Sequence, residues 1–449
     1  MKDSATGITE FIANLEKQNP HEPEFRQAVT EVIHDLIPFI AANPRYQNKM
    51  LLERLSEPDR IITFRISWMD DAGNIRINRG YRVQNCNAIG PYKGGIRFHP
   101  SVNLSILKFL AFEQTLKNSL TGLPMGGAKG GADFDPKGKS DAEVMRFCQS
   151  MILELWRYIG PDTDVPAGDI GVGGREVGYM FGQYKRLSNS FTGTFTGKGV
   201  DFGGSLGRTE ATGYGAVYIL SEVLIQNKED IAGKRVLISG SGNVAVYAAE
   251  KAVQMGAIVT TLSDSGGFIY DKNGFNAEKL ACIKQLKFTE RSRIEKYCDH
   301  FDAEFHAGQK PWSIPAEIAL PCATQNEIQV VDARTLVDNG CKYLVEGANM
   351  PTAIDAISLL LASRVHFVPG KAANAGGVAV SGLEMTQNSL RLVWSAREVD
   401  IKLHDIMRGI HQKCARHGSE ADGFINYSKG ANIAGFIKVA DAMLALGVV

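Results

Sequence analysis

Residues 236–245 have the sequence Val-Leu-Ile-Ser-Gly-Ser-Gly-Asn-Val-Ala, and this stretch decides the fold class. Its apolar beginning predicts a buried strand that runs into the G-x-G-x-x-A pattern Gly240-Ser241-Gly242-Asn243-Val244-Ala245. The first glycine makes a tight turn, the second lets the backbone approach a pyrophosphate, and the alanine permits close packing of helix on strand. A helix predicted over residues 243–255 presents its positive end to the phosphates. The stretch therefore predicts a dinucleotide site in a Rossmann-type domain.

The sequence that follows alternates between strand and helix patterns. A second strand is predicted at residues 258–262, and later apolar runs occupy 318–320, 343–345 and 365–368. Each of these later runs ends in a loop rich in Gly, Asn, Pro or Thr. This order is typical of an α/β fold with a doubly wound parallel sheet, whose ligands lie beyond the carboxyl ends of the strands.

The first 200 residues have a different pattern. Residues 1–60 have helical spacing, two strands are predicted at 61–68 and 75–84, and a helix is predicted at 103–120. Residues 120–215 are unusually rich in glycine, which predicts loops that turn tightly or admit a ligand to the backbone. The pattern closes with an amphipathic helix at 433–446.

Length and composition limit the class of protein. A chain of 449 residues predicts two or three domains, and 49 basic residues balance 49 acidic ones. Zero net charge gives no support to binding of nucleic acid or an anionic membrane. We expect a cytoplasmic protein, because the start lacks a signal peptide and no apolar run approaches a membrane span. Seven widely spaced cysteines without a Cys-x-x-Cys pair predict thiols and no metal site.

Spacing alone does not choose between the two nicotinamide cofactors. Asp264 lies close to the end of the second predicted strand, where an acidic residue favours the ribose 2′-hydroxyl of NAD. Its neighbours Ser263 and Ser265 could instead bond the 2′-phosphate of NADP. A basic cluster that could neutralise this phosphate follows, although such clusters are more often solvated helix faces; it comprises Lys287, Arg291 and Arg293.

Three lysines and one aspartate stand in suggestive settings. Lys93 lies in GPYKGGIRFHP, Lys129 in PMGGAKGGADFDP and Asp169 in PAGDIGVGG, whereas Lys117 lies beside Gln114 on the helix at 103–120. Each alone is more often structural, and a lysine at the edge of a buried face commonly extends to water. Lys129 is the one that nearby cations could bring toward a neutral pKa for acid–base work. Together the four describe a pocket for a dianion beside an ionisable carboxylate.

Eight segments resemble those of the glutamate dehydrogenases and occur in that family's order along essentially the whole chain. They are GPYKGGIRFHP, LPMGGAKGGADFDP, PAGDIGVGGREVGYM, GRTEATGYG, SGSGNVA, ALPCATQNEI, EGANMPT and PGKAANAGGVAVSGLEM. The resemblance implies a substrate-binding and oligomerisation domain at residues 1–203, with the C-terminal helix at 425–449 packing back on it. It implies a Rossmann-type cofactor domain at residues 204–424, a cleft between the domains, and a homohexamer.

The resemblance also assigns roles around the substrate. Lys93 and Ser381 are expected to hold the side-chain carboxylate, and Lys117, aided by Gln114, the α-carboxylate. Lys129 is the expected catalytic lysine, Asp169 the acid–base partner of the amine, and Gly168 the carbonyl that faces this amine. Asn374 and Val378 are expected near the nicotinamide and the side chain of the substrate. Arg208 and Thr212 are expected at the hinge side of the cofactor cleft. The residues expected near the ribose and nicotinamide are Ala323, Thr324, Asn349 and Asn374.

These roles imply a reaction. The expected activity is the reversible oxidative deamination of L-glutamate to 2-oxoglutarate and ammonium, with Lys129 activating water and Asp169 handling the amine proton. Lys93 and Ser381 favour glutamate over apolar amino acids, because burying a carboxylate without a partner costs several kcal/mol. The segment Ser263-Asp264-Ser265 with the basic cluster resembles the NADP-using members, so NADP is expected and NAD is the alternative. A dehydrogenase of another amino acid is the second alternative.

Overall fold

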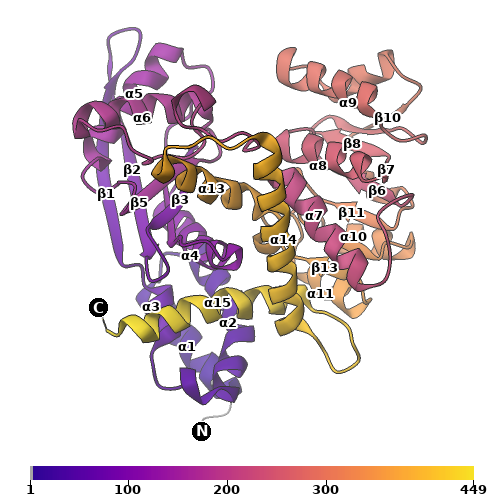
Figure 1. The fold of residues 1–449 in the computed structure, drawn as a ribbon, viewed down its shortest axis with the longest axis horizontal. Helices are drawn as coiled ribbons and strands as arrows, with labels where there is room; N and C mark the ends of the chain where they lie inside the picture. Colours follow the sequence, from indigo (N-terminus) through magenta and orange to yellow (C-terminus); the bar gives the residue numbers. More distant parts are fainter. Residues whose placement is uncertain (1–3, 449) are drawn as a thin grey trace. The chain divides into compact units, whose positions relative to one another are not determined.

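The computed structural model describes residues 4–448, which divide into two units (Figure 1). Unit 1 spans Met1–Leu206, Ser381–Ala396 and Asn432–Val449, and unit 2 spans Gly207–Val380 and Arg397–Ala431. Three segments differ from the domain bounds expected from the sequence. Residues 204–206 and Ser381–Ala396 group with unit 1, and residues 425–431 group with unit 2. No helix within the described part of the chain is long and apolar enough to cross a membrane.

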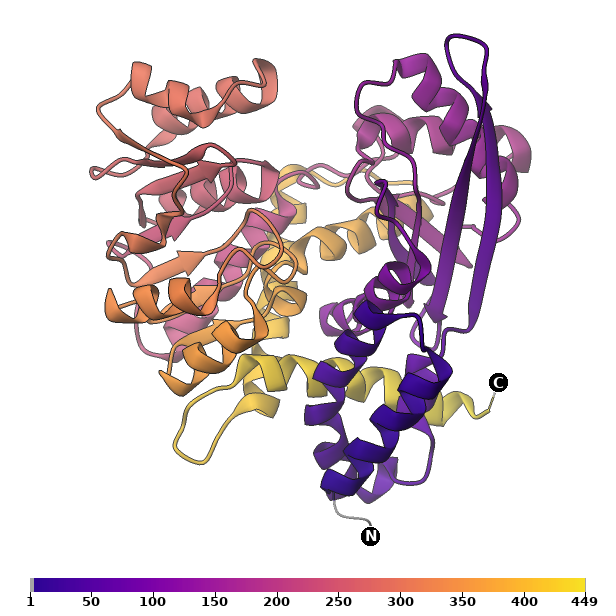
Figure 2. The same cartoon turned by 180° about the vertical axis from the view of Figure 1, so that it is seen from behind.

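Unit 1 is organised around a five-stranded sheet in the order β1-β2-β4-β3-β5. Its strands are β1 (Arg60–Met69), β2 (Ile75–Cys86), β3 (Tyr92–Phe98), β4 (Gly127–Ala132) and β5 (Asp164–Gly168). The predicted strands at 61–68 and 75–84 are confirmed as the antiparallel hairpin β1–β2, whose long indigo strands lie side by side in Figure 2. β2 is antiparallel to β4, whereas β3 is parallel to both β4 and β5.

Part of the glycine-rich stretch is strand, although the sequence predicts loops there. Residues 127–132 form β4, which is buried along its whole length. The glycines are required because the chain packs closely on both sides of this region. A Cβ on Gly127 would lie 1.9 Å from the hydroxyl oxygen of Thr115, and a Cβ on Gly94 would lie 1.6 Å from the carbonyl oxygen of Ala128. These contacts leave no room for side chains at either position.

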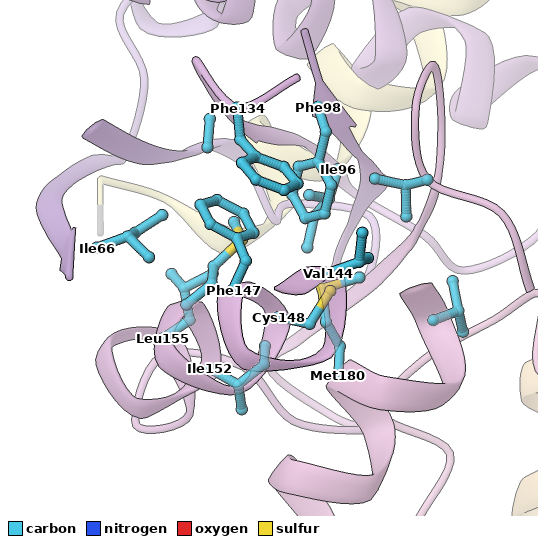
Figure 3. Packing of buried hydrophobic residues seen from close by; sticks show 14 of the residues in the cluster. Ile66, Ile96, Phe98, Phe134, Val144, Phe147, Cys148, Ile152, Leu155 and Met180 are labelled. Carbon is cyan, nitrogen blue, oxygen red and sulfur yellow. The ribbon is translucent and has the colours of Figure 1, made fainter. Parts of the chain in front are cut away.

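Helices cover both faces of this sheet. On one face α4 (Leu104–Thr121) packs against β2 through Leu107, Ala111 and Val83. On the other face α5 (Asp141–Leu155) and α6 (Gly174–Ser188) enclose a large apolar core (Figure 3). In this core the rings of Phe134 and Phe147 stack with their centroids 3.8 Å apart. Each buried side chain of this size contributes roughly 1.5–3 kcal/mol to stability.

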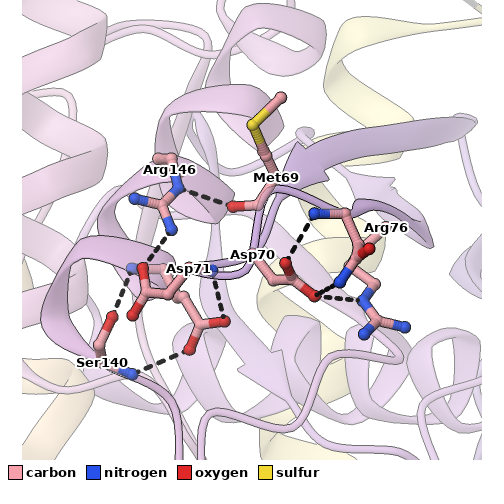
Figure 4. A network of polar contacts seen from close by, with 8 residues as sticks. Met69, Asp70, Asp71, Arg76, Ser140 and Arg146 are labelled. Carbon is pink, nitrogen blue, oxygen red and sulfur yellow. Dashed lines mark hydrogen bonds and ion pairs between the residues drawn. The ribbon is translucent and has the colours of Figure 1, made fainter.

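The turn of the β1–β2 hairpin is fixed by two neighbouring carboxylates (Figure 4). Asp70 accepts a hydrogen bond from Arg76 Nε at 2.8 Å, and Asp71 pairs with Arg146 of α5 at 2.6 Å. Arg146 also donates to the carbonyl oxygen of Met69 at 2.7 Å. These pairs lie near the surface, where solvent screens them, so each contributes little to stability. Their effect is to hold the turn against the start of α5.

Most of the other helical elements of unit 1 lie near the two ends of the chain. The helical spacing at 1–60 is confirmed from residue 4 on, and residues 1–3 lie outside the described part. The elements are α1 (Ser4–Gln18), α2 (Pro23–Ala42), the 3-10 turn η1 (Pro44–Tyr46), α3 (Leu51–Ser56), η2 (Val200–Phe202) and α15 (Tyr427–Leu446). The last helix begins six residues before the predicted 433. Asn432 donates to Asp35 of α2 at 2.7 Å, and the carbonyl oxygen of Gly435 accepts from Ser119 of α4 at 2.7 Å.

Unit 2 contains the parallel sheet predicted from the sequence. Five parallel strands follow the order β13-β12-β11-β6-β7, so the chain winds outward from β6 in both directions. They are β6 (Arg235–Ile238), β7 (Ile258–Val259), β11 (Ile318–Leu320), β12 (Tyr343–Val345) and β13 (His366–Val368). Its helices include α7 (Ala211–Gln226), α8 (Asn243–Gln254), α10 (Val330–Asp338), α11 (Ile354–Ala362), α12 (Gly370–Ala373) and α14 (Ala396–Gly418). The α/β fold with a doubly wound sheet is confirmed.

The prediction of one strand at 258–262 is wrong. The chain leaves the main sheet after β7, and β8 (Thr261–Asp264) joins a separate antiparallel sheet with β9 (Gly267–Tyr270) and β10 (Glu304–Ala307). The hydroxyl of Thr261 accepts from the backbone N–H of Ile238 at 3.0 Å and so replaces a strand–strand hydrogen bond. Between β9 and β11 lie α9 (Ala277–Lys284), the π-turn η3 (Gln285–Thr289) and the 3-10 turns η4 (Ile294–Asp299) and η5 (Pro311–Ser313).

Candidate active site

The strands of unit 1 bring four charged side chains to one face of the sheet. Alternate residues of a strand share a face, so Lys93 and Arg97 of β3 lie on the same side. Arg97 pairs with Gly131, two residues after Lys129 on β4, and Gly95 of β3 pairs with Ala167, two residues before Asp169. The register therefore places all four charged side chains on the face that α4 covers.

Asp169 is the centre of a buried charge cluster. Its Oδ2 accepts from Arg97 Nε at 2.7 Å and lies 3.2 Å from Lys129 Nζ. The Lys129 side chain is only 6% exposed. Burial lowers the pKa of Lys129; the charge of Asp169 opposes this effect, whereas the charge of Arg97 adds to it. Burial alone would raise the pKa of Asp169, but the two cations outweigh it and lower this pKa.

Helix α4 supplies polar groups beside this cluster. Asn103 caps its start, where its side chain accepts from the backbone N–H of Ile106, and Gly122 caps its end in a left-handed conformation. Gln114 and Lys117, both half-buried, lie near its end. Asn118 donates to the carbonyl oxygens of Lys93 at 3.1 Å and Gly126 at 2.5 Å.

Those bonds from Asn118 hold the end of α4 against β3. Lys93 is 1% exposed, so its ammonium group belongs to the interior of unit 1. Gln114 donates to the side-chain oxygen of Asn118 at 2.7 Å. Asn118 therefore fixes α4 beside Lys93, and Gln114 is hydrogen-bonded to Asn118.

A loop next to β5 completes the site within unit 1. Thr196 donates its backbone N–H to Pro166 at 3.0 Å, two residues before Gly168. Its side-chain hydroxyl is buried without a hydrogen-bond partner among the described residues. Glu384 of α13 (Gly376–Leu390) holds this loop, because it pairs with Lys198 at 2.7 Å and accepts from the backbone N–H of Gly197 at 2.9 Å. Ser381, which is buried, precedes Glu384 by one helical turn on α13.

In unit 2 the predicted dinucleotide turn has the required shape. Gly240 adopts φ +86°, and a Cβ there would lie 2.9 Å from the carbonyl oxygen of Cys322. A Cβ on Gly242 would meet nothing within 4 Å, so open space lies in front of the first turn of α8. Gly242 and Asn243 are exposed, while Ser241 is buried. This arrangement fits a pyrophosphate bound by the backbone at the positive end of the helix.

At the ribose end of this site the acidic residue does not have the free carboxylate that binding of the NAD 2′-hydroxyl requires. Ser263 faces the turn and accepts from Gly240 N at 2.7 Å. Asp264 accepts from the backbone N–H of Gly266 at 2.8 Å and of Ile294 at 3.0 Å, and it lies 3.3 Å from Lys287 Nζ. Burial alone would raise the pKa of Asp264, but these partners lower it. The Asp264 carboxylate is therefore already bonded to backbone N–H groups and a lysine of the protein itself.

The basic residues predicted near Asp264 do not all take part. Arg293 lies 4.0 Å from Asp264 and donates to the Ser265 hydroxyl at 2.5 Å, and its side chain is 66% exposed. Lys287 is mostly covered and donates to Ser292 as well as to Asp264. Arg291 is exposed, and none of the ion pairs between described residues in this cluster includes it.

The ends of β11 and β12 carry the other predicted cofactor residues. Ala323 and Thr324 are exposed after β11, where Ala323 N donates to Glu327 at 3.0 Å. Asn374 is buried and donates to the Asn349 side chain at 2.8 Å. Sequence reasoning missed Glu327, which joins this loop to Ser239 at 2.9 Å and thereby to the dinucleotide turn.

The start of α13 gathers three more predicted residues in unit 2. A Cβ on Gly377 would lie 2.5 Å from the Thr212 hydroxyl and 3.6 Å from Arg208 Nη1. Val378, the next residue, is half-buried. This crowding explains why glycine follows Asn374-Ala375-Gly376 in the sequence.

Sequence reasoning also missed Arg97 and Thr196 in unit 1. The signal for Arg97 was available, because residues 93, 95 and 97 alternate on a strand and share a face. No local pattern marked Thr196, whose hydroxyl becomes significant only through its burial. Among residues 4–448, no group of three or more His, Cys, Asp or Glu side chains is arranged to hold a metal ion.

Comparisons with known proteins match both halves of the chain. A family model described as Glutamate/Leucine/Phenylalanine/Valine dehydrogenase matches residues 203–447, and one described as Glu/Leu/Phe/Val dehydrogenase, dimerisation domain, matches residues 58–186. The chain is 59% identical to the NADP-specific glutamate dehydrogenase of Haemophilus influenzae over 98% of each chain. It is 57% identical to the NAD-specific glutamate dehydrogenase of Bacteroides fragilis over 98% of this chain and 100% of the relative. The solved structure of Plasmodium falciparum glutamate dehydrogenase matches with a TM-score of 0.97 at 50% identity, covering 99% of this chain and 96% of that one.

Proposed function

The chain belongs to the Glu/Leu/Phe/Val dehydrogenase family, and from this premise we propose that it is an NADP-dependent glutamate dehydrogenase. It catalyses the reversible oxidative deamination of L-glutamate to 2-oxoglutarate and ammonium. One observation carries the proposal for this chain's own residues. The buried cluster of Lys129, Asp169 and Arg97 provides a lysine of lowered pKa next to an ionised carboxylate, as acid–base chemistry at an amine requires.

Two separate lysines support glutamate as the substrate. Lys93 and Lys117 are separate ammonium groups on β3 and α4, and glutamate has two carboxylates. In the proposed complex Lys93 and Ser381 bind the side-chain carboxylate, and Lys117 with Gln114 binds the α-carboxylate. An apolar amino acid would offer no carboxylate to the buried Lys93 ammonium, so the ion pair of the proposed complex would be lost. Gly168 offers its carbonyl oxygen to the amine, and Asn374 and Val378 belong to the pocket as expected from the sequence.

The protein's residues perform the proton transfers. When bound, the oxidised nicotinamide would supply the acceptor for the α-hydrogen of glutamate, which leaves as hydride while Asp169, held ionised by its two cations, binds the neutral amine. Lys129, in its neutral form, removes a proton from a water molecule as the water's oxygen bonds to the resulting iminium carbon, which gives a neutral carbinolamine. Asp169, 3.2 Å from Lys129 Nζ, passes this proton from Lys129 to the nitrogen. The carbon–nitrogen bond then breaks as Lys129, neutral again, takes the hydroxyl proton, so ammonia and 2-oxoglutarate form and Lys129 holds the one proton that the reaction releases.

The environment of Asp264 supports NADP as the cofactor. An acidic residue that selects NAD must offer its carboxylate to the ribose hydroxyls. Here backbone donors and Lys287 occupy that carboxylate, and the exposed Arg293 beside Ser265 provides a cation and a hydroxyl for a phosphate. Gly240 through Val244 hold the pyrophosphate, and Arg208, Thr212, Ala323, Thr324 and Asn349 complete the cofactor contacts in this proposal.

The expected assembly and location complete the proposal. A homohexamer is supported by the resemblance and by the description of the family model over residues 58–186 as a dimerisation domain. Light scattering of the purified protein tests this assembly, and fractionation of cells tests the cytoplasmic location. Neither nucleic acid nor membrane is needed for the proposed reaction.

Initial rates provide the deciding experiment. Purified protein is assayed with 2-oxoglutarate and ammonium at matched concentrations of NADPH and NADH, with Lys129→Met as the inactive control. Faster turnover with NADPH supports the proposal in full. Turnover with NADH alone retains glutamate dehydrogenation but reverses the interpretation of Asp264, in line with the NAD-specific relative. No turnover with either cofactor rejects the proposed substrate.

A further inference from the structure

Arg97 transfers no proton in the reaction described above, yet it contacts the acid–base carboxylate directly. Its Nε lies 2.7 Å from Asp169 Oδ2, the two residues are 72 positions apart in sequence, and both side chains are about 15% exposed. A hydrogen bond of this length between two ionised groups is of the strong, charge-assisted kind.

We propose that Arg97 is a positioning residue of the proposed dehydrogenase reaction: it fixes the Asp169 carboxylate through Oδ2 and directs Oδ1 to the substrate nitrogen. This inference rests on the proposed function, because it presumes that Asp169 exchanges a proton with the amine. Arg97 acts through Asp169 and does not itself need to touch the substrate.

The contacts of Asp169 explain the direction of its carboxylate. Both Arg97 and Lys129 approach the same atom, Oδ2, at 2.7 and 3.2 Å. The lone pairs of Oδ1 are therefore the ones that these two contacts leave to a substrate donor. Without Arg97, Lys129 would be the single cation on the carboxylate, and the Asp169 side chain could rotate toward it.

The backbone around Asp169 is positioned without help from Arg97. Strands β3 and β5 are joined by parallel pairing from Tyr92 to Ile96. Just beyond, Phe98 N donates to the carbonyl oxygen of Ile170 at 2.9 Å. The Arg97 side chain therefore adds little to the joining of the strands, and its specific contribution is to the carboxylate.

The charge of Arg97 also acts on Lys129. The charged groups that act on Lys129 include Asp169 after β5 and Arg97 on β3, which share its face of the sheet, and Arg82 of β2 on the opposite face; both arginines lower its pKa. A shallow hollow next to Asp169 brings three further charged side chains near the cluster, namely Lys137, Arg175 and Glu176. Removing Arg97 takes away a nearby cation and strengthens the pairing of Lys129 with Asp169. Both changes favour the protonated form of Lys129, so they act in the same direction.

Substitution of Arg97 separates this role from a structural one. On the acid side of the plot of kcat against pH, the rise in kcat reports deprotonation of Lys129, and we call this rise the acid limb. In Arg97→Gln the acid limb should move to higher pH by about one unit. In Arg97→Lys, which keeps the charge, the limb should move less than half as far. Arg175→Gln is the matched control, since it removes another ion-paired arginine from the same hollow without contact to Asp169, and it should leave the limb in place.

The measurement is made on the full-length protein, with melting temperatures to confirm folding. A lower kcat in Arg97→Gln with an unmoved limb, or the same shift in Arg97→Lys and Arg97→Gln, overturns the inference. A second readout does not depend on turnover: the pH dependence of acetylation of Lys129 by acetic anhydride, followed by peptide mass spectrometry. Its midpoint should rise in Arg97→Gln, and an equal midpoint in wild type also overturns the inference. An inactive wild-type protein would reject the proposed function alone.

Discussion

Replacing Asp164 with asparagine should destabilise unit 1 strongly, because the change leaves Arg82 as a buried charge without a counter-ion. Both side chains are fully buried, with 0% exposure. Arg82 donates to Asp164 through Nε at 2.9 Å and through its Nη2 atom, and Gln84 donates to the same carboxylate at 2.9 Å. Arg82 Nη1 donates to the carbonyl oxygen of Gly94 at 3.0 Å and keeps the guanidinium in place.

The size of the effect follows from the burial. Removing one partner of a buried ion pair costs about 3–5 kcal/mol, because the remaining charge stays desolvated. For a unit of this size the melting temperature falls by roughly 2–4 °C per kcal/mol, so Asp164→Asn should lower the unfolding transition by about 6–20 °C. The exposed neighbour Asp162 provides the matched control, since Asp162→Asn should change stability by less than about 0.5 kcal/mol.

Thermal and urea unfolding at one protein concentration measure both variants. A loss below about 1 kcal/mol in Asp164→Asn would refute the reasoning, since it would mean that water or another group compensates Arg82. The double variant Arg82→Met/Asp164→Leu tests the same argument from the opposite side. Removing both charges together should recover more than half of the lost stability, because replacing a whole buried pair by apolar side chains is often neutral.

Three further predictions concern the reaction. Lys93→Leu should lower kcat/KM for glutamate by about 10²–10⁴-fold while turnover of apolar amino acids persists, which steady-state kinetics on both substrate classes will measure. Asp169→Asn should lower kcat by about 10²–10⁴-fold with NADPH binding unchanged, as seen by fluorescence titration; a kcat within tenfold of wild type would remove Asp169 from the proton transfers. Arg293→Ser should raise the KM for NADPH about tenfold and leave the KM for NADH unchanged. Arg291→Ser is the control and should change neither KM. Equal effects of the two variants would contradict the proposed contact of Arg293 with the phosphate.

The two faces of the unit 1 sheet carry separate charge systems. Lys129, Asp169 and Arg97 lie on the face covered by α4, and they remain partly accessible. Arg82 and Asp164 occupy the opposite face, because Arg82 pairs with Gly130, the residue after Lys129. In the proposed reaction the first system exchanges protons, whereas the second is a buried ion pair that joins β2 to β5 and, through the Gly94 carbonyl, to β3.

Several features of the protein were determined by the sequence itself. Gly240 requires glycine because its φ is +86°, and Gly242 leaves open space in front of α8, so the motif predicts the dinucleotide site. Residues 318–320 and 343–345 form strands with the bounds that their apolar runs predict. Lys93, Lys129 and Asp169 could be singled out because glycines surround them, and the order of eight segments identified the family resemblance.

Only the tertiary structure decided how the distant groups meet. The non-sequential strand order β4-β3-β5 brings Arg97 to Asp169 across 72 residues, and no local pattern encodes that order. The position of Asp264 in the sequence favours a contact with the ribose, but in the structure the backbone N–H of residue 294 and Lys287 bind its carboxylate. The break between β7 and β8 depends on the Thr261 hydroxyl finding Ile238 on another strand. In each case the deciding interaction joins residues far apart in the chain, so its geometry exists only after the sheets have formed.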